Sequence, residues 1–168
     1  TFRSTRPLRI HVKLDTGMHR QGFQLHEIPA LIRALRKLPR SVKVEGVYTH
    51  FAAAKNPALP AETLAQLAQF TSAMDALAAA GFHLLRPAAA TSGTLLFPQT
   101  HFDLVRIGIG LYGHWPSEEV RAACSDHLTL TPALAWRTLL TEVKTIPAGS
   151  AIGYNGTEIV ERNTHIGI

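Results

Sequence analysis

The segment "HVKLDTGMHRQGF", residues 11–23, decides how the first part of this chain folds. It begins with the β-branched alternation of a strand and continues as a charged turn interrupted by glycines. Lys13, Asp15, His19 and Arg20 fall within eight positions of one another at this strand end. A structural turn needs glycine and at most one aspartate, so two cations aimed at the same place indicate a site.

Strand and helix patterns alternate beyond this segment. β-branched and alternating runs predict strands at 8–15, 42–52, 83–93 and 102–113. Helical spacing predicts two helices, at 25–40 ending near Pro39 and at 60–82 ending near Gly81. Their expected apolar faces are Ile28, Leu31, Ile32, Leu35 and Leu38, and Leu64, Leu67, Phe70, Met74 and Leu77.

This alternation implies parallel strands, whose carboxyl ends collect the chemistry in such folds. Polar residues do follow the strands, at Lys13–Arg20, Thr49–His50, Thr91–Ser92 and Arg106–Gly110. For this arrangement we expect a closed barrel rather than an open sheet. From about residue 114 the helical period disappears, and turn signals at 147–149 and 154–156 predict an all-β segment.

Composition limits the classes of protein. The 168 residues are 46% hydrophobic and 17% charged, which suits a soluble globular chain of one domain or slightly more. We expect no membrane span and no secretory signal, and the single cysteine, Cys124, favours a reducing, cytoplasmic compartment. The net charge is +5, but the basic residues are scattered, so anionic small molecules fit better than nucleic acid. No metal site is expected.

Both ends of the chain look interrupted. It starts without Met and ends at "RNTHIGI", within a strand pattern. We therefore expect a fragment of a longer protein.

Four blocks, in this order, resemble alanine racemase: "HVKLDTGMHRQGF", "GVYTHFAAA", "FDLVRIGIGLYG" and "IPAGSAIGYNG". The resemblance implies an α/β fold, with the C-terminal part of a (β/α)8 TIM barrel at 1–116 and the beginning of a C-terminal β-domain at 117–168. It also implies a pyridoxal 5'-phosphate enzyme that interconverts L-alanine and D-alanine for peptidoglycan precursor synthesis. The family works as a homodimer whose active site is shared across subunits.

The resemblance assigns a role to both cations of the opening segment. Arg20 matches the arginine that hydrogen-bonds the phenolic oxygen of the cofactor. Lys13 matches a lysine that in many members carries a carbamate and holds that arginine, so one of the two cations becomes an anion. The alternative is that Lys13 extends toward solvent and Arg20 pairs with Asp15. We expect Asp15 to anchor the turn.

Arg106 matches the family arginine that contacts the pyridine nitrogen. An arginine does not readily give up a proton, so it keeps that nitrogen unprotonated. Gly108 and Ile109 would offer backbone N–H groups to the phosphate, although "GIGLYG" could also be only a tight strand exit. His50 matches a supporting residue near the cofactor ring; its alternative is an ordinary core histidine.

Two further residues are implied by the resemblance. Ser92 would place its hydroxyl on the phosphate, but Thr91 stands where the family has asparagine, and a serine here could be a simple turn former. Tyr154, in "IGYNG", matches the tyrosine base, which needs nearby positive charge because a free tyrosine titrates near pH ~10. Its alternative is an ordinary hairpin tyrosine.

The sequence also departs from the family. The lysine that bonds the cofactor lies upstream in the family, and Lys43, Lys55 and Lys144 lack its surrounding motif, so we expect this chain alone not to racemise alanine. His19 stands where many members have glycine. The blocks "LDTGMHR" and "IGYNG" together are similar to the branch in which the racemase is fused to a peptidoglycan-precursor ligase.

Two other readings remain open. One is a different barrel-type pyridoxal-phosphate enzyme, such as a broad-specificity amino-acid racemase or a decarboxylase. The other is a non-catalytic remnant that binds phosphate.

Overall fold

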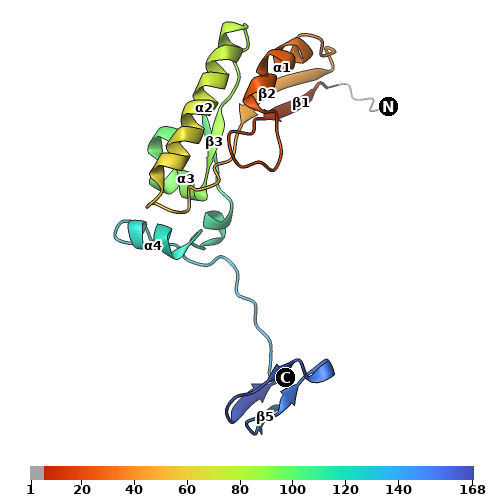
Figure 1. The fold of residues 1–168 in the computed structure, drawn as a ribbon, viewed down its shortest axis with the longest axis vertical. Coiled ribbons are helices and arrows are strands. Elements are labelled where there is room, and N and C mark those ends of the chain that lie inside the picture. Colours follow the sequence, from red (N-terminus) through yellow and green to blue (C-terminus); the bar gives the residue numbers. More distant parts are fainter. Residues whose placement is uncertain (1–5) are drawn as a thin grey trace. The chain divides into compact units, whose positions relative to one another are not determined.

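The computed structural model describes residues 6–168 and divides the chain into two compact units, Thr1–Ala133 and Leu134–Ile168 (Figure 1). The first unit mixes helices with parallel strands, as the alternating pattern predicts. The second holds short antiparallel strands. None of the helices among residues 6–168 is long and apolar enough to cross a membrane.

The first unit opens with a strand–helix–strand repeat. Strands β1 and β2 pair in parallel, and a 3-10 turn and helix α1 connect them. The bounds are β1 Leu8–Lys13, η1 Leu25–Glu27, α1 Ile28–Leu35 and β2 Val42–Tyr48. The predicted face of α1 is confirmed at Ile28, Leu31 and Leu35, which are buried. Leu38, which we expected on the same face, lies beyond the end of the helix and is exposed.

A long helix leads from β2 to the next parallel pair. Its elements are α2 Pro60–Ala79, β3 Pro87–Ala90 and β4 Leu104–Arg106. Helix α2 ends before Gly81, whose φ of 91° is the left-handed conformation that glycine adopts without strain. Strand β3 pairs with β4. Just before β3, Leu85 donates its N–H to the carbonyl of Glu45 and accepts the N–H of Val47, both in β2. The carboxyl ends of all four strands therefore lie along one edge.

Two expectations for this region are corrected. Leu64 was expected on the buried face of α2, but it is 42% exposed, while Thr63 and Gln66 are buried instead. The third strand was expected to run to residue 93, but it ends at Ala90 and helix α3, Thr91–Leu96, follows at once. Thr91 and Ser92 therefore lie in the first turn of a helix rather than in a loop.

The core of the unit lies between its helices and strands. Phe70 and Leu77 of α2 are fully buried. So are Leu14, which follows β1, and Val47, which lies within β2. Phe70 meets the ring of Phe102 edge-on, with centroids 5.7 Å apart. This core holds α2 against the strands whose ends carry the polar residues.

A short helix appears where we expected β structure. Helix α4, Glu118–Cys124, starts at Ser117, whose hydroxyl accepts the N–H of Val120. A serine followed by acidic residues is a local helix-start signal, because the hydroxyl caps the first N–H groups and the acids favour the positive end of the helix dipole. The first compact unit continues to Ala133, so the domain boundary at 116 stays a prediction.

The second unit consists of two antiparallel pairs. Strand β5 (Val143–Ile146) pairs with β8 (Thr164–Gly167), and β6 (Ala151–Ile152) pairs with β7 (Glu158–Ile159). The turn between β6 and β7 contains Asn155 at a φ of 61°. The predicted strand-and-turn character of this segment is confirmed; that it opens a larger β-domain stays a prediction.

Candidate functional site

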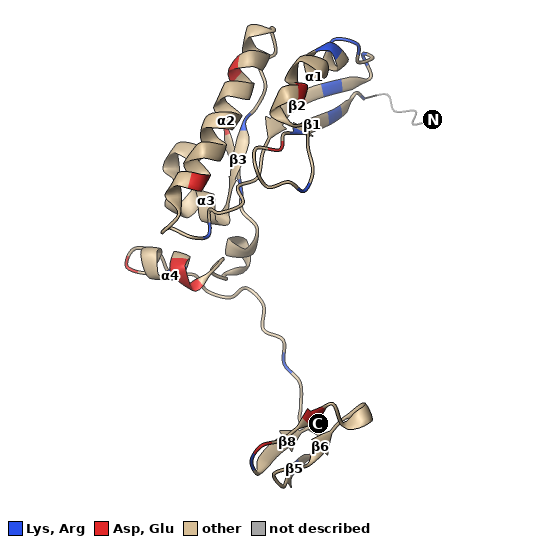
Figure 2. Cartoon of the chain, viewed as in Figure 1, with Lys and Arg blue, Asp and Glu red and all other residues tan. Residues whose placement is uncertain are grey.

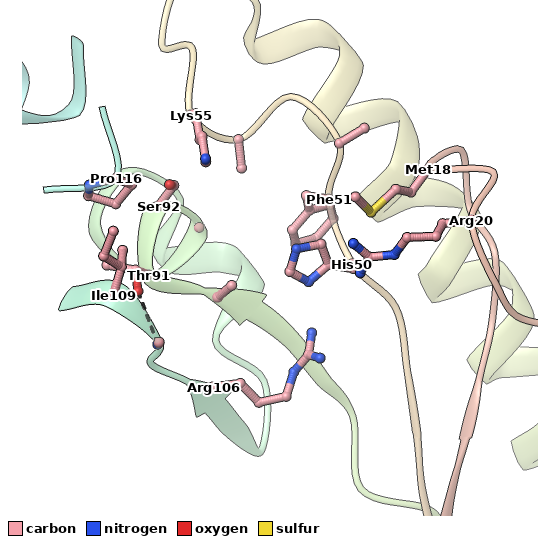
Figure 3. A pocket seen from close by; sticks show the side chains of 15 residues that line it. Met18, Arg20, His50, Phe51, Lys55, Thr91, Ser92, Arg106, Ile109 and Pro116 are labelled. Carbon is pink, nitrogen blue, oxygen red and sulfur yellow. Dashed lines mark hydrogen bonds between the residues drawn. The ribbon is translucent and has the colours of Figure 1, made fainter. Parts of the chain in front are cut away.

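A cavity of about 550 Å³ lies at the carboxyl ends of the parallel strands of the first unit. Its walls come from the loops after β1 and β2, from the start of α3, and from the segment after β4 (Figure 3). The lining residues are Met18, Arg20, His50, Phe51, Ala52, Ala54, Lys55, Ala90, Thr91, Ser92, Gly93, Arg106, Gly108, Ile109 and Pro116.

The cavity brings together most of the site residues expected from the sequence. Arg20 and Arg106, from opposite ends of the unit's sequence, both line it, and their guanidinium groups point toward the imidazole of His50 (Figure 3). Ser92, Gly108 and Ile109 line it as well. The parallel fold explains this, because it gathers strand ends that are far apart in the chain.

Arg106 is the most firmly held of these side chains. It ends β4, and its Nη2 donates to the carbonyl of Thr49 at 2.6 Å and to that of Ala88 at 3.1 Å. Its guanidinium also stacks 4.8 Å from the ring centre of Tyr48. Burial lowers the pKa of Arg106, although a guanidinium stays charged at any physiological pH.

The Nε–H of Arg106 has no such partner. It is buried, and the described residues offer it no acceptor. A buried donor without an acceptor costs about 1–3 kcal/mol, so a ligand acceptor placed here would recover that energy.

His50 lies among cations. Burial lowers the pKa of its imidazole, and the nearby charges of Arg106, Arg20, Lys13 and Lys55 lower it further. Its ring is therefore neutral at pH 7. A neutral imidazole between two arginines can donate one hydrogen bond and accept another.

The turn that opened the sequence analysis is anchored by Asp15, as expected. Its Oδ1 accepts the N–H of Gly17 at 3.1 Å and that of His19 at 2.9 Å. Burial raises the pKa of Asp15, but these N–H groups and the charge of His19 outweigh it and leave the pKa below its usual value. Its carboxylate also lies 3.6 Å from Nδ1 of His19. Among the described residues, Arg20 forms no ion pair with Asp15, so that part of the alternative is wrong.

His19 adopts a backbone conformation that favours glycine. Its φ is 53°, in the left-handed region that glycine enters without strain. The two contacts with Asp15 hold it there.

Lys13 lies beside the cavity rather than in its lining. It borders a neighbouring hollow with Phe23 and Glu27. Burial lowers the pKa of Lys13, and the charges of Arg20 and Arg106 lower it further, against an opposite effect of Asp15. The neutral amine is therefore more accessible than in a free lysine; carbamylation stays a prediction.

Thr91 contacts the backbone N–H groups that we expected to bind a phosphate. The N–H of Gly108 donates to Oγ1 of Thr91 at 3.2 Å, and that of Gly110 does so at 3.4 Å. In this structure the N–H of Gly108 is thus already hydrogen-bonded, and its role toward a phosphate stays a prediction. A Cβ added at Gly108 would meet nothing within 4 Å, so the backbone there is open to a ligand.

Tyr154 belongs to the second unit. It lies in the turn η4, Tyr154–Gly156, and is 97% exposed. Its assignment as a base stays a prediction.

Sequence reasoning missed Gln66, which ties the strand exits together beneath the cavity. Its Oε1 accepts the N–H of Ala52 at 2.8 Å, and its Nε2 donates to Thr16 Oγ1 at 3.3 Å and to the carbonyl of His50 at 3.4 Å. The hydroxyls of Thr16 and Thr49 lie 2.7 Å apart in the same network. The available signal was its position four residues before Phe70, on the buried side of α2.

The charge of the lining has one sign. It contains Arg20, Lys55 and Arg106, but neither aspartate nor glutamate. Within the described residues of the unit, the acids of the helices lie mainly on α2 and α4, whereas Lys and Arg gather on β1, β2 and α1 (Figure 2). The cavity is therefore suited to an anionic molecule.

The fold and the cavity define a class: a mixed α/β domain whose site, at the carboxyl ends of parallel strands, is lined by cations. The family model "Alanine racemase, N-terminal domain" matches residues 2–116, and the chain belongs to this family.

Known relatives agree with this assignment. The alanine racemase of Symbiobacterium thermophilum is 41% identical over 159 residues, which cover 94% of this chain and 41% of the relative. That of Syntrophobacter fumaroxidans is 40% identical over 148 residues, covering 88% and 38% respectively. This chain therefore spans about two fifths of the length of the curated relatives that it matches.

Solved structures are similar too. The alanine racemase of D-cycloserine-producing Streptomyces lavendulae is 36% identical with a TM-score of 0.77, covering 95% of this chain and 42% of that one. The Bacillus anthracis enzyme with bound L-Ala-P is 31% identical with a TM-score of 0.79, covering 96% and 41%.

Proposed function

We propose that this chain is part of an alanine racemase, a cytoplasmic, pyridoxal-phosphate-dependent isomerase that interconverts L-alanine and D-alanine and so supplies peptidoglycan precursor synthesis. The observation that carries the proposal is the shared cavity of Arg20 and Arg106, with no carboxylate in its lining. Family membership and relatives named alanine racemase support it.

The same proposal extends to the fold. The four parallel strand exits of the first unit are the C-terminal part of a (β/α)8 barrel, and the antiparallel strands after Leu134 begin a β-domain. The parallel pairing of β1 with β2 and of β3 with β4 supports the first statement.

The residues present fit pyridoxal phosphate. The buried Nε–H of Arg106 needs an acceptor, which an unprotonated pyridine nitrogen provides. Arg20 would hold the phenolic oxygen, and Ser92 with Ile109 and Gly108 would hold the phosphate. When bound, the cofactor stabilises the negative charge that develops at the α-carbon of the amino acid.

Arg106 would control the protonation of a pyridine nitrogen placed at its Nε–H. Its carbonyl contacts with Thr49 and Ala88 fix the guanidinium, and because an arginine does not readily give up a proton, the nitrogen would act as an acceptor only. His50 supports the same arrangement as a neutral ring between the two arginines.

Lys13 would complete the charge balance around Arg20. Its lowered pKa favours the neutral amine, whose nitrogen can attack CO2 and release a proton to give a carbamate. The carbamate would be an anion next to Arg20.

Tyr154 is proposed as a base that acts in the site of a second subunit of a homodimer. Its high exposure leaves its hydroxyl available for such a contact. A base within hydrogen-bond reach of the α-proton is what racemisation needs.

The test uses a chimera in which this chain replaces the matching segment of the Symbiobacterium thermophilum enzyme. We expect it to exchange the α-proton of alanine in D2O and to convert one enantiomer into the other. Tyr154→Phe should lower the rate by about 10²–10⁴-fold while cofactor binding is kept. A folded chimera that binds the cofactor but exchanges no α-proton of alanine contradicts the proposal.

A further inference from the structure

Lys55 lines the cavity but has no role in the function proposed above. It lies in the loop between β2 and α2, and its side chain points toward the cavity, opposite the side from which Arg106 enters (Figure 3). The residue is exposed, and among residues 6–168 no carboxylate forms an ion pair with it. It is a free cation at the opening of a cationic cavity.

The backbone around Lys55 is held in place. Its carbonyl accepts the hydroxyl of Ser117, the residue that begins α4, at 3.1 Å. Earlier in the same loop, the N–H of Ala52 is bound to Gln66, and after it the N–H of Ala58 is bound to the side chain of Asn56. The Lys55 side chain thus starts from a backbone that hydrogen bonds hold in place.

The charge of Lys55 reaches the interior of the cavity. It is one of the four cations that lower the pKa of His50. Because no carboxylate lines the cavity, no acidic side chain of the lining offsets the charges of Arg20, Lys55 and Arg106, and an anion that enters would do so.

We propose that Lys55 is an anion-binding residue of this cavity, whose ammonium group holds an oxyanion, either a phosphate or a carboxylate, near the cavity opening. A lysine is suited to this as a mobile point charge, whereas Arg106 is fixed by its carbonyl contacts. The inference extends the proposed function, but it depends only on the cavity and its charge.

The test compares Lys55→Gln and Lys55→Arg with a matched control, Lys37→Gln. Lys37 is an exposed lysine beyond the end of α1 and outside the cavity lining. Binding of inorganic phosphate and of acetate to the 168-residue chain is followed through the imidazole NMR signals of His50.

Lys55→Gln should weaken binding of one of the two anions by about two- to fivefold at low salt, with a smaller difference at high salt. Lys55→Arg and Lys37→Gln should bind as the parent does. Loss confined to phosphate identifies the phosphate as the partner, and loss confined to acetate identifies a carboxylate.

A second readout separates this role from a structural one. Lys55→Gln should raise the pKa of His50, because a nearby cation is removed, and Lys37→Gln should leave that pKa unchanged. If Lys55→Gln changes neither anion binding nor the pKa of His50, the inference is wrong.

The two proposals fail in different ways. A chain that does not bind pyridoxal phosphate, yet binds inorganic phosphate in a Lys55-dependent way, contradicts the cofactor and supports the inference. If the chain binds pyridoxal phosphate equally well with and without Lys55, and the affinity for acetate does not change either, the cofactor proposal is supported and the inference about Lys55 is contradicted.

Discussion

The two units of this chain differ in what specifies their structure. In the first, Val47, Phe70 and Leu77 are completely buried. In the second, none of residues 134–168 is buried, and Trp136 and Tyr154 are 94% and 97% exposed. The first unit is specified by packing, and the second by strand pairing and by turns such as that at Asn155. Two-stranded sheets of this kind are marginally stable in water.

The difference explains where the candidate site is. A rigid packed unit can hold Arg20, His50 and Arg106 around one cavity, because Gln66 and the core fix the loops that carry them. A side chain on a surface-exposed turn, such as Tyr154, has no comparable support within its own unit.

The largest effect expected from this comparison is on the core. Phe70→Ala should lower the free energy of unfolding of the first unit by about 3–5 kcal/mol, because it leaves a cavity under α2. The exposed Trp136→Ala should change it by less than about 0.5 kcal/mol. Chemical denaturation followed by circular dichroism measures both. Equal losses in the two variants would mean that the second unit is packed after all.

The next largest effect is expected on ligand binding in the cavity. Arg106→Met should weaken binding of pyridoxal phosphate by more than about tenfold, because hydrogen bonds from a charged donor contribute about 1.5–3 kcal/mol each. Fluorescence titration with the cofactor provides the measurement. Arg121→Met, at an exposed arginine of α4, is the matched control and should bind normally. Unchanged binding by Arg106→Met would remove Arg106 from the site.

The next prediction tests whether the hydrogen bonds of Gln66 stabilise the loops that carry the cavity residues. Gln66→Met should destabilise the unit by about 1–3 kcal/mol, because the N–H of Ala52 loses its acceptor. Gln69→Met, one turn along α2 at an exposed position, should have almost no effect. Hydrogen exchange at the Ala52 amide should accelerate only in the first variant. If that amide stays protected in Gln66→Met, the network does not hold the loop.

The smallest effect is a pH dependence at His50. Its pKa is lowered in the folded chain, so the unfolded chain binds its proton more readily. The corresponding stability is fully present above the unfolded pKa, near pH ~6.5, and is lost as the pH falls from there toward the folded pKa. His50→Gln should flatten this slope in denaturation curves recorded between about pH 5 and 8. An equally steep slope in that variant would assign it to another group.

Much of the first unit could be predicted from the sequence. The strand–helix alternation, the helix stop at Gly81 and the polar strand ends depend on local pattern, which a single sequence contains. The helix expected to end near Pro39 ends earlier, at Leu35. Local pattern failed where tertiary burial chose otherwise. Leu64 looks like a core residue by spacing, but the rotation of α2 that buries Phe70 turns Gln66 inward and leaves Leu64 exposed.

Some residues of the candidate site could be predicted from the sequence, and others could not. The residues Arg20, His50, Ser92 and Arg106 could be named in advance because each lies at or shortly after the end of a strand pattern and because the resemblance to alanine racemase gives each a role. Lys55 carries no such signal, because it is a lysine in a loop. Gln66 has only its spacing to Phe70, which indicates burial but no hydrogen-bonding role. Helix α4 had a local signal at Ser117, which was overlooked.

By itself, the sequence determined that this is an α/β chain with cations at its strand ends and an Asp15-anchored turn, since those features depend on neighbours along the chain. Only the tertiary structure decided that Arg20 and Arg106 share one cavity, that the Nε–H of Arg106 lacks an acceptor, and that Lys55 faces the same space. The physical reason is that burial and electrostatic fields depend on distances through space, and parallel strands bring together residues that the sequence keeps far apart.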